Sequence, residues 1–321
     1  MEGDNGNVFN SGIVTSDNEA INIDGTGNEV VNTGILSAID HGVEFNTLTS
    51  EVNVLVNSGR IESSNLSNPT VRGDFGDETV VNSGLIVGSV SLGAGNDVFN
   101  GRGGTVTGSI LGGAGDDLFI IDDASTEIVE LSSEGTDEVR SFVSYKLAQN
   151  FENLKLRGAS DLNGTGNALA NTLTGNEGDN ILKGRKGNDT LAGNDGDDTL
   201  FGQKGKDLLQ GQAGDDRILG GDSVDTIDGG ADDDRLTGGG GNDKFIFADG
   251  FGKDVITDFD EFKNGEKIDL SAVATITDLA DLKADHLSQS GAHAVINAGG
   301  GNTITLLNVN ISDLNAGDFI F

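Results

Sequence analysis

The sequence predicts an all-β protein built as a parallel β-solenoid, and two repeat patterns together with the composition carry this prediction. Glycine recurs every nine residues from Gly175 to Gly238, and a longer pattern of 22 to 25 residues runs through the N-terminal third. The 321 residues include 51 Gly, 1 Pro, no Trp and only 15 Phe, which differs from the composition of an ordinary globular core. We therefore expect a thin, repetitive core.

The N-terminal third repeats the motif Asn-Ser-Gly or a near variant. It occurs in VFNSGIV, VVNTGIL, LVNSGRI and VVNSGLI, with its asparagine at Asn10, Asn32, Asn57 and Asn82. Short apolar segments flank each motif, and a third one is visible in AINID, GVEF and SVSL. We expect a three-faced parallel β-helix over residues 1–111, with the asparagines stacked at one corner. The pattern resembles repeats of bacterial surface and autotransporter-like β-helices.

Eight nine-residue units follow one another from Gly175. In each unit the sixth residue carries a side-chain oxygen and the eighth is apolar. The sixth residues are Asn180, Asp189, Asp198, Asp207, Asp216, Asp225, Asp234 and Asp243. The eighth residues are Leu182, Leu191, Leu200, Leu209, Ile218, Ile227, Leu236 and Phe245. Each unit therefore supplies one oxygen ligand and one candidate core residue.

The chemistry of the unit indicates how it folds. Six residues rich in Gly and Asp favour a turn, and the remaining three favour a short strand whose central side chain points inward. Two units then complete one coil, so that turns 18 residues apart stack and Asp189 lies over Asp207. Such columns of carboxylates repel one another unless a cation lies between them. Ca²⁺ prefers six to eight oxygen ligands and suits these turns better than Mg²⁺.

These residues carry a family resemblance. The units GRKGNDTLA, GNDGDDTLF and GQAGDDRIL resemble the nonapeptide G-G-x-G-x-D-x-U-x of RTX, or hemolysin-type, proteins, whose repeats form a calcium-loaded parallel β-roll. The lead-in SYKLAQNFENLKLRGASDLNGTGNALANTLTGNEGDNIL resembles the segment that precedes such rolls. GNDKFIFADGFGKDVITDFDEFKNGEKIDLS and the final AGDFIF are similar to the C-terminal region of serralysin-like proteins exported by the type I pathway. The resemblance covers residues 140–321.

The resemblance implies a set of calcium ligands. The position-six carboxylates from Asp189 to Asp243 are nominated, with Asn171 and Asn180 as neutral starters. Ser223 and Asp232 replace the glycine at position four, which puts in doubt full occupancy of their turns. About five to seven Ca²⁺ ions are expected in the roll. The implied turn residues, which bind through carbonyl oxygens, are Gly184, Lys186, Gly187, Gly193, Asp195, Gly196, Gly202, Lys204, Gly205, Gly211, Ala213, Gly214, Gly220, Gly229, Gly239 and Gly241.

Two isolated units precede the main array. They are LGAGNDVFN from Leu92 and GGAGDDLFI from Gly112, and the second matches the nonapeptide fully. They nominate a further calcium site with Asp97, Gly112, Ala114 and Asp117. Their separation of 20 residues rather than 18 makes the stacking of these two units an open question.

The remaining segments divide the chain further. We expect a transition coil and connecting segment over residues 112–162, the roll over 163–247, and a cap with the secretion region over 248–321. Residues 124–162 interrupt the repeats and are expected to stack on the open end of the roll. In TDLADLKADHLSQ the leucines at 279, 282 and 287 favour a helix with Thr277 as its N-cap. HAVINAGGGNTITLLNV is typical of a hairpin.

Charge excludes several partners. The chain has 53 acidic and 19 basic residues, a formal net charge of -34, which disfavours nucleic acid and anionic membrane surfaces and favours cations. With no cysteine, it has neither disulfides nor thiolate chemistry. No apolar run approaches the roughly 18 residues that a membrane span needs. We expect a secreted, non-catalytic protein of structural or adhesive role, with the type I secretion apparatus as a partner during export and polysaccharide or a cell surface as partners outside.

Two other functions remain open. The three histidines form no H-E-x-x-H motif, and no G-x-S-x-G motif occurs, so protease and lipase signatures are absent from the sequence. A mannuronan epimerase or polysaccharide lyase, or a non-catalytic module of one, needs a base and a charge neutraliser. The candidates are His41, Arg60 and Arg72, with Asp40 and Glu44 nearby, although we favour solvated residues on loops. A surface-array (S-layer) protein is the other alternative.

Overall fold

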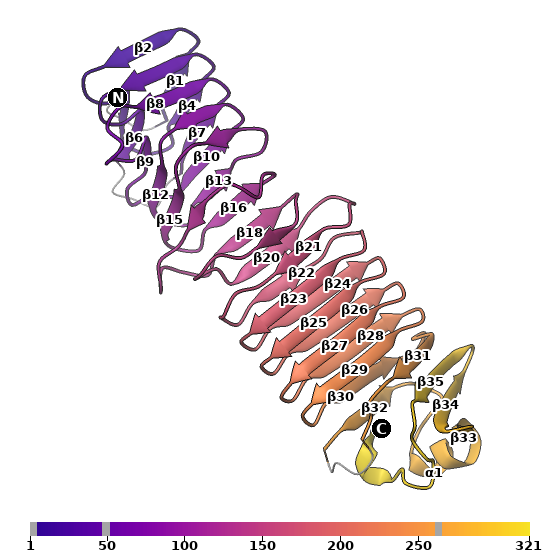
Figure 1. Ribbon diagram of the computed structural model, residues 1–321. Coiled ribbons are helices and arrows are strands. Elements are labelled where there is room, and N and C mark those ends of the chain that lie inside the picture. Colours follow the sequence, from indigo (N-terminus) through magenta and orange to yellow (C-terminus); the bar gives the residue numbers. More distant parts are fainter. Residues whose placement is uncertain (1–4, 47–51, 261–264) are drawn as a thin grey trace. The chain divides into compact units, whose positions relative to one another are not determined.

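The computed structural model describes residues 5–46, 52–260 and 265–321. It confirms the all-β fold, a parallel β-solenoid with little helix. The chain divides into two compact units. The first comprises Met1–Val143 with Leu147–Asn153, and the second comprises Ser144–Lys146 with Leu154–Phe321. Figure 1 shows the stacked strands of each unit.

The first unit is the predicted three-faced β-helix, because each coil contributes strands to three parallel sheets in turn. One sheet contains β1 (Asn7–Asn10), β4 (Glu29–Asn32), β7 (Asn53–Asn57), β10 (Glu78–Asn82), β13 (Val98–Asn100), β16 (Leu118–Ile121) and β18 (Glu138–Ser141). The next contains β2 (Ile13–Ser16), β5 (Ile35–Ala38), β8 (Arg60–Ser63), β11 (Leu85–Val87) and β14 (Thr105–Val106). The third contains β3 (Ile21–Asp24), β6 (Val43–Asn46), β9 (Val71–Arg72), β12 (Val90–Ala94), β15 (Ile110–Ala114) and β17 (Ile128–Val129).

The predicted asparagine stack is confirmed. The amide Nδ2 of Asn10 donates to Oδ1 of Asn32, Asn32 donates to Asn57, and Asn57 donates to Asn82, each over 2.8 Å. Asn32, Asn57 and Asn82 are fully buried, so the ladder satisfies polar groups that would otherwise be costly inside the coil.

The glycine of the same motif is required by close contact between coils. A Cβ atom at Gly59 would lie 2.1 Å from the carbonyl oxygen of Gly34, and one at Gly84 would lie 2.2 Å from that of Gly59. The motif thus combines an amide that links coils with a glycine that lets their backbones approach.

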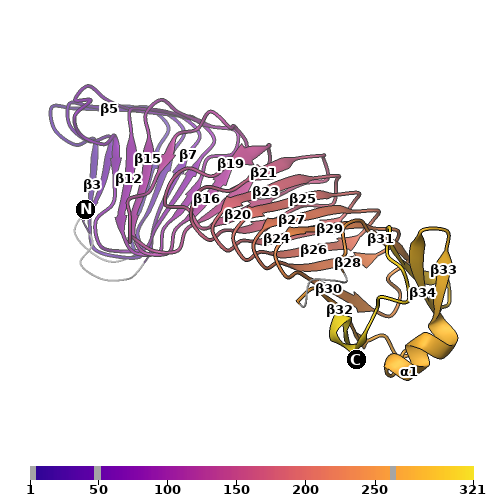
Figure 2. The same cartoon turned by 60° about the horizontal axis from the view of Figure 1, so that its bottom comes forward.

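The second unit has two sheets, and successive strands from β19 to β32 alternate between them, as expected for a roll (Figure 2). One sheet contains β20 (Asn153–Leu156), β22 (Thr172–Thr174), β24 (Thr190–Asp195), β26 (Leu208–Ala213), β28 (Thr226–Ala231), β30 (Lys244–Ala248), β32 (Lys267–Ala272) and β36 (Phe319–Ile320). The other contains β19 (Tyr145–Lys146), β21 (Asn163–Thr165), β23 (Ile181–Lys186), β25 (Thr199–Lys204), β27 (Arg217–Asp222), β29 (Arg235–Gly240), β31 (Lys253–Ile256), β35 (Asn302–Leu306), β34 (His293–Gly299) and β33 (Leu287–Ser290).

The core of the roll is the predicted apolar column. The eighth residue of every nine-residue unit, from Leu182 to Phe245, is fully buried, and Leu191 of β24 pairs with Leu209 of β26 in the 18-residue register. The strands are longer than the three residues expected. Strand β24 has six residues because the ladder continues through Asn194, which pairs with Gln212.

Residues 124–162 form strands that interrupt the repeat pattern but not the parallel pairing. In the first unit, β17 pairs with β15 and β18 pairs with β16. In the second unit, β19 pairs with β21. Coils therefore persist where the sequence loses its period, because strand pairing depends on the backbone and inward apolar residues rather than on the turn motif.

The C-terminal cap contains the predicted hairpin, since β34 and β35 pair in antiparallel fashion around Gly299. The predicted helix is shorter than expected. It consists of α1 (Leu279–Asp281) and a π-helical turn, η1 (Leu282–His286), and Leu287 already begins β33. Thr277 is not the N-cap. The Asp278 carboxylate accepts the N–H groups of Ala280 and Asp281 instead, because its side chain stands directly before the first turn.

A 3₁₀ turn, η2 (Ala316–Asp318), precedes the final strand β36. Among the described residues, no helix is long and apolar enough to cross a membrane.

Candidate calcium sites

The position-six aspartates lie at the ends of the roll strands and link successive coils. Oδ1 of Asp207 accepts the backbone N–H of Asp189 over 2.8 Å, and Oδ1 of Asp216 accepts that of Asp198 over 2.8 Å. The same bond, at 2.9 Å, joins Asp207 to Asp225, Asp216 to Asp234, and Asp225 to Asp243. The aspartates therefore form two columns, one at each end of the strands, with the predicted 18-residue spacing.

The second oxygen of these carboxylates points into the turn. In six consecutive units Oδ2 is buried and has no hydrogen-bond partner. These units carry Asp189, Asp198, Asp207, Asp216, Asp225 and Asp234, all at most 3 % exposed. A buried carboxylate oxygen without a partner is costly, whereas a bound cation would satisfy it.

The first glycine of each unit keeps space open beside that oxygen. A Cβ atom at Gly184 would lie 2.3 Å from Oδ2 of Asp189, and one at Gly211 would lie 2.0 Å from Oδ2 of Asp216. Gly193, Gly202, Gly220 and Gly229 stand in the same relation to the aspartate of their own units, at 2.1 to 2.4 Å. A side chain at position one would therefore fill the space that an ion needs.

Burial changes the acidity of these carboxyl groups. Loss of solvent raises the pKa of Asp198 and Asp225 to about 7, and that of Asp216 and Asp234 to about 8. Neighbouring acidic residues raise these pKa values further, and the N–H bonds to Oδ1 oppose the shift. Without a cation these groups would hold protons near neutral pH. Oxygen-rich turns of this kind suit Ca²⁺, with carboxylates and turn carbonyls as the ligands.

Ser223 and Asp232, which replace a glycine, keep the turn conformation of the other units. Their φ angles are 85° and 80°, in the region where Gly187 and Gly196 stand at 111° and 110°. Asn171 and Asn180, the neutral starters, also occupy the columns, since their N–H groups donate to Asp189 and Asp198.

One further aspartate joins a column and was missed from the sequence. Oδ1 of Asp254 accepts the N–H of Asp234 over 2.9 Å, its Oδ2 has no partner, and burial raises its pKa to about 8. The spacing is 20 residues, so a search for an 18-residue step does not reach it. The available signal was the local pattern Asp254-Val255-Ile256, which repeats the Asp-x-apolar step of each unit.

The two isolated units also stack, despite their 20-residue separation. Ala94 of β12 is in register with Ala114 of β15, and the N–H of Asp97 donates to Oδ1 of Asp117 over 2.7 Å. Oδ2 of both aspartates is buried without a partner, and burial raises the pKa of Asp97 to about 7 and that of Asp117 to about 8. Coils of the first unit differ in length, and strand pairing is kept although this coil has two residues more than the 18-residue coil of the roll.

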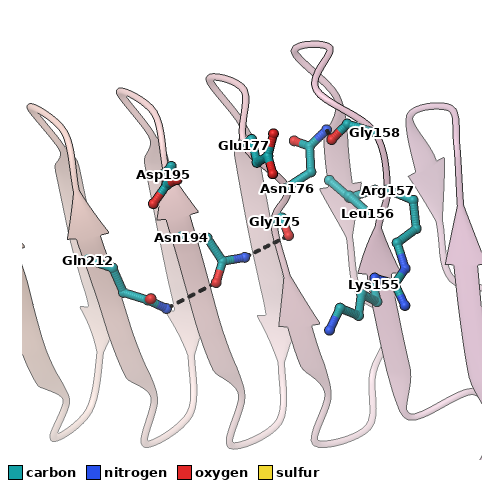
Figure 3. A pocket seen from close by; sticks show the side chains of 10 residues that line it. All are labelled: Lys155, Leu156, Arg157, Gly158, Gly175, Asn176, Glu177, Asn194, Asp195 and Gln212. Atoms are coloured by element: carbon teal, nitrogen blue, oxygen red, sulfur yellow. Dashed lines mark hydrogen bonds between the residues drawn. The ribbon is translucent and has the colours of Figure 1, made fainter.

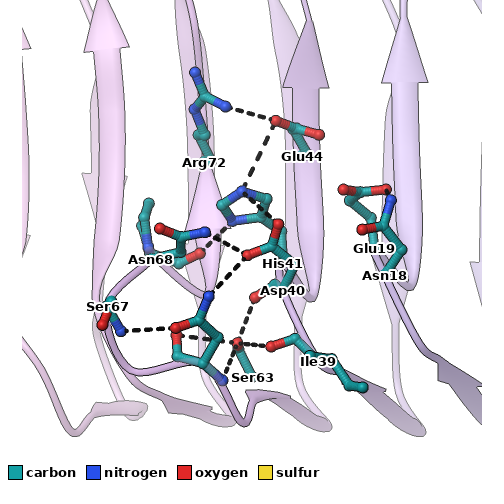
Figure 4. A network of polar contacts seen from close by, with 12 residues as sticks. Asn18, Glu19, Ile39, Asp40, His41, Glu44, Ser63, Ser67, Asn68 and Arg72 are labelled. Atoms are coloured by element: carbon teal, nitrogen blue, oxygen red, sulfur yellow. Dashed lines mark hydrogen bonds and ion pairs between the residues drawn. The ribbon is translucent and has the colours of Figure 1, made fainter.

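The residues nominated for polysaccharide chemistry are only partly brought together (Figure 4). His41 is 4 % exposed, not solvated as expected, because it packs between coils. Its Nδ1 donates to the carbonyl of Pro69 over 2.6 Å, and its Nε2 lies 3.9 Å from Glu44, which also accepts from Arg72 over 2.8 Å.

Asp40 also lies beside His41, 4.0 Å from its Nε2, and a hydrogen bond from Asn68 is the main cause that lowers its pKa. Arg60 stands on β8, in a different sheet from Arg72, and pairs with Glu62. Arg60 is therefore not brought together with His41 and Arg72.

A polar hollow of about 280 Å³ lies on the roll (Figure 3). Lys155 and Arg157 line it together with an amide row in which Gln212 donates to Asn194, and Asn194 donates to the carbonyl of Gly175. Glu177 and Asp195 also line the hollow. It offers cations and hydrogen-bonding groups on an otherwise acidic chain.

Comparisons with known proteins place the repeats in a family. The model of the RTX calcium-binding nonapeptide repeat, which holds four copies, matches residues 89–107, 165–200, 192–226, 210–245 and 219–256. No curated protein matches the chain.

Two solved structures are similar over parts of the chain. The extracellular lipase LipA of Serratia marcescens is 18 % identical, with a TM-score of 0.33, over 84 % of this chain and 45 % of the lipase. The chain therefore spans less than half the length of that lipase. The AlgE6R2 subunit of the mannuronan C5-epimerase of Azotobacter vinelandii is 26 % identical, with a TM-score of 0.28, over 51 % of this chain and 94 % of the subunit. By the family match, residues 89–107 and 165–256 carry RTX calcium-binding nonapeptide repeats.

Proposed function

We propose that this chain is an exported calcium-binding protein whose roll folds as Ca²⁺ enters it outside the cell, and whose role there is structural or adhesive. The observation that carries the proposal is the row of buried, unpartnered Oδ2 atoms, one in each of six consecutive units. Each one faces a space that the first glycine of its unit keeps open. The metal-free fold therefore contains repeated electrostatic defects that calcium would remove.

The energetics support coupling of folding to binding. At free calcium about tenfold above a site's dissociation constant, each ion adds roughly 1.4 kcal/mol. Five to seven ions would add about 7 to 10 kcal/mol, comparable to the whole stability of a domain. Extracellular calcium modules have dissociation constants near 10⁻⁴ to 10⁻³ M, above cytosolic calcium. The roll would stay unfolded inside the cell and fold outside.

The packing of residues 316–321 is compatible with export before folding. In the folded chain β36 pairs with β32, with Phe319 in register with Ile268, and Phe319 is buried. A type I signal in this region would be partly buried in the folded state, because Asp318 and Phe319 are buried although Ile320 and Phe321 are exposed, and it would be fully open in an unfolded chain. Export of the unfolded chain would therefore leave the signal accessible to the secretion apparatus.

Calcium-dependent folding is tested by circular dichroism and size measurement in chelator and in millimolar Ca²⁺. We expect strong β signal and compact size only with calcium. Asp207→Ala and Asp216→Ala each remove a carboxylate that links two coils, so we expect a loss of several calcium equivalents. Asp195→Ala is the matched control, because its side chain is exposed and its backbone carbonyl remains. Identical β signal in chelator and in calcium would refute the proposal.

The adhesive role is supported by the hollow of Figure 3, whose cations and amides suit a polysaccharide that carries carboxylate and hydroxyl groups. Binding of such polymers should weaken in the double variant Lys155→Gln, Arg157→Gln. It should persist in Arg185→Gln, Lys204→Gln, which removes two cations from another part of the roll. Equal binding by both variants would exclude this hollow as the site.

The two alternatives have distinct signatures. Turnover of alginate-like polymers that disappears in His41→Ala or Arg72→Ala would identify a polysaccharide-modifying enzyme. Calcium-dependent lateral assembly into ordered arrays would identify a surface-array protein.

A further inference from the structure

Three buried carboxylates gather in the first unit, at a place where the sequence nominated only one. Asp117, Glu130 and Asp137 are 2 %, 3 % and 1 % exposed, and each offers one oxygen within 4.8 Å of those of the other two. Oxygens on opposite sides of one Ca²⁺ ion stand about 5 Å apart, so this separation suits a shared ion.

Strand pairing explains how three separate positions meet. Leu118 of β16 pairs with Glu138 of β18, which stacks the preceding residues Asp117 and Asp137. The N–H of Asp117 donates to Oδ1 of Asp137 over 2.9 Å. In the neighbouring sheet, Leu111 of β15 pairs with Val129 of β17, which places Glu130 beside Gly112.

A glycine keeps a space open where two of these side chains point. A Cβ atom at Gly112 would lie 2.2 Å from Oδ2 of Asp117 and 2.1 Å from Oε1 of Glu130. Oδ2 of Asp117 is buried without a hydrogen-bond partner and is aimed into this space. Oε1 of Glu130 accepts the N–H of Gly112 over 3.1 Å, and a carboxylate oxygen with one such bond still has a lone pair for a cation.

The electrostatic surroundings favour a cation. Burial is the main cause that raises the pKa of Asp117 and Glu130 to about 8 and that of Asp137 to about 6. The charged neighbours that shift these pKa values are all acidic, and they include Asp97, Glu134 and Glu152. The charged neighbours with the largest effects on these pKa values therefore have the same sign as the cluster itself.

We propose that Glu130 and Asp137 join Asp117 in one calcium site, which shares Asp117 and Gly112 with the site nominated from the sequence and binds Ca²⁺ more tightly than the turns of the roll. Affinity for Ca²⁺ rises with the number of charged ligands and with the rigidity of the site. Here three carboxylates share one buried space: Asp117 stands before β16, Glu130 after β17 and Asp137 before β18. Glu130 stands outside any nonapeptide unit. The site does not rest on the proposed calcium loading of the roll, because all of its residues belong to the first unit.

The test uses the full chain, dialysed to equilibrium against radioactive Ca²⁺ buffered near 1 to 10 µM, a range typical of sensor sites and about a hundredfold below that of extracellular modules. The wild-type chain should retain one equivalent and Glu130→Gln none. Glu127→Gln is the matched control, because it lies on the same segment with an exposed side chain, and it should retain the ion. In millimolar Ca²⁺, Glu130→Gln should bind one equivalent fewer with unchanged β signal.

Two further variants separate this site from the roll. Asp207→Ala with Asp216→Ala should keep the micromolar equivalent while losing millimolar ones. Gly112→Ala should lose the micromolar equivalent, because its methyl group occupies the space between the carboxylates. The proposal is overturned if the wild-type chain binds no calcium at micromolar concentration, or if Glu130→Gln and Glu127→Gln bind it equally.

Discussion

Glycine and non-glycine residues share the left-handed positions of each roll turn. The second and fourth residues of a unit both have positive φ, and six consecutive units use one glycine and one other residue there. Gln212 stands at 85° beside Gly214 at 120°, whereas Ser223 at 85° follows Gly221 at 122°. A left-handed non-glycine residue costs about 1 to 2 kcal/mol. With one glycine in each turn, only one of the two left-handed residues carries this conformational cost. Where Ser223 and Asp232 replace the glycine at position four, Gly221 and Gly230 occupy position two instead.

The fourth-position glycines have a second role that a substitution can isolate. At Gly214 a Cβ atom would lie 2.2 Å from the carbonyl oxygen of Gly196, whereas at Gly250, with φ of 93°, it would meet open space. We predict that Gly250→Ala lowers the free energy of unfolding in saturating calcium by about 1 to 2 kcal/mol. Gly214→Ala should lower it by more, as measured by denaturant unfolding. Equal losses would show that the stacked turns tolerate a methyl group.

The asparagine ladder joins four coils of the first unit through a continuous chain of amide hydrogen bonds. Asn57 lies in its interior and bonds to both Asn32 and Asn82, while Asn10 ends the ladder and is partly exposed. We predict that Asn57→Ala lowers the free energy of unfolding by about 1 to 3 kcal/mol, because it leaves buried amide groups without partners. Asn10→Ala, the matched control, should cost less. The ladder would have no stabilising role if thermal unfolding of the two variants were identical to that of the wild-type chain.

The sequence predicted the elements correctly wherever successive coils repeat the same sequence pattern. The nine-residue period predicted the column from Leu182 to Phe245 and the stacking of aspartates, because identical units must pair in register. Asp254 and Glu130 were missed because their coils have other lengths or no turn motif. The burial of His41 and the strand at Leu287 depend on which segments pack beside them, and neighbouring residues in the sequence do not encode this.

In the molecule as a whole, the net negative charge and the binding of metal ions are linked, because the same carboxylates account for both. A chain of net charge -34 repels itself, and folding of the roll places further carboxylates in buried columns. Cations or protons must therefore accompany folding. Calcium and acid should act as alternatives, because both neutralise the same Oδ2 atoms.

The pH dependence of the metal-free chain follows from the raised pKa values. The folded pKa of Asp216 and Asp234 is about 8, against an ordinary value of 3.8, so the folded state binds more protons than the unfolded one between these limits. Their contribution to stability is therefore fully present below pH 3.8 and is lost as the pH rises to about 8. In chelator, we predict that β signal rises as the pH falls from 8 to 4. In millimolar calcium, bound calcium should instead increase from pH 5 to 8, because ions displace protons.

The double variant Asp216→Asn, Asp234→Asn should show a smaller pH slope in chelator and fewer calcium equivalents, which separates the columns from general charge repulsion. An unchanged slope in that variant would place the pH dependence elsewhere in the chain.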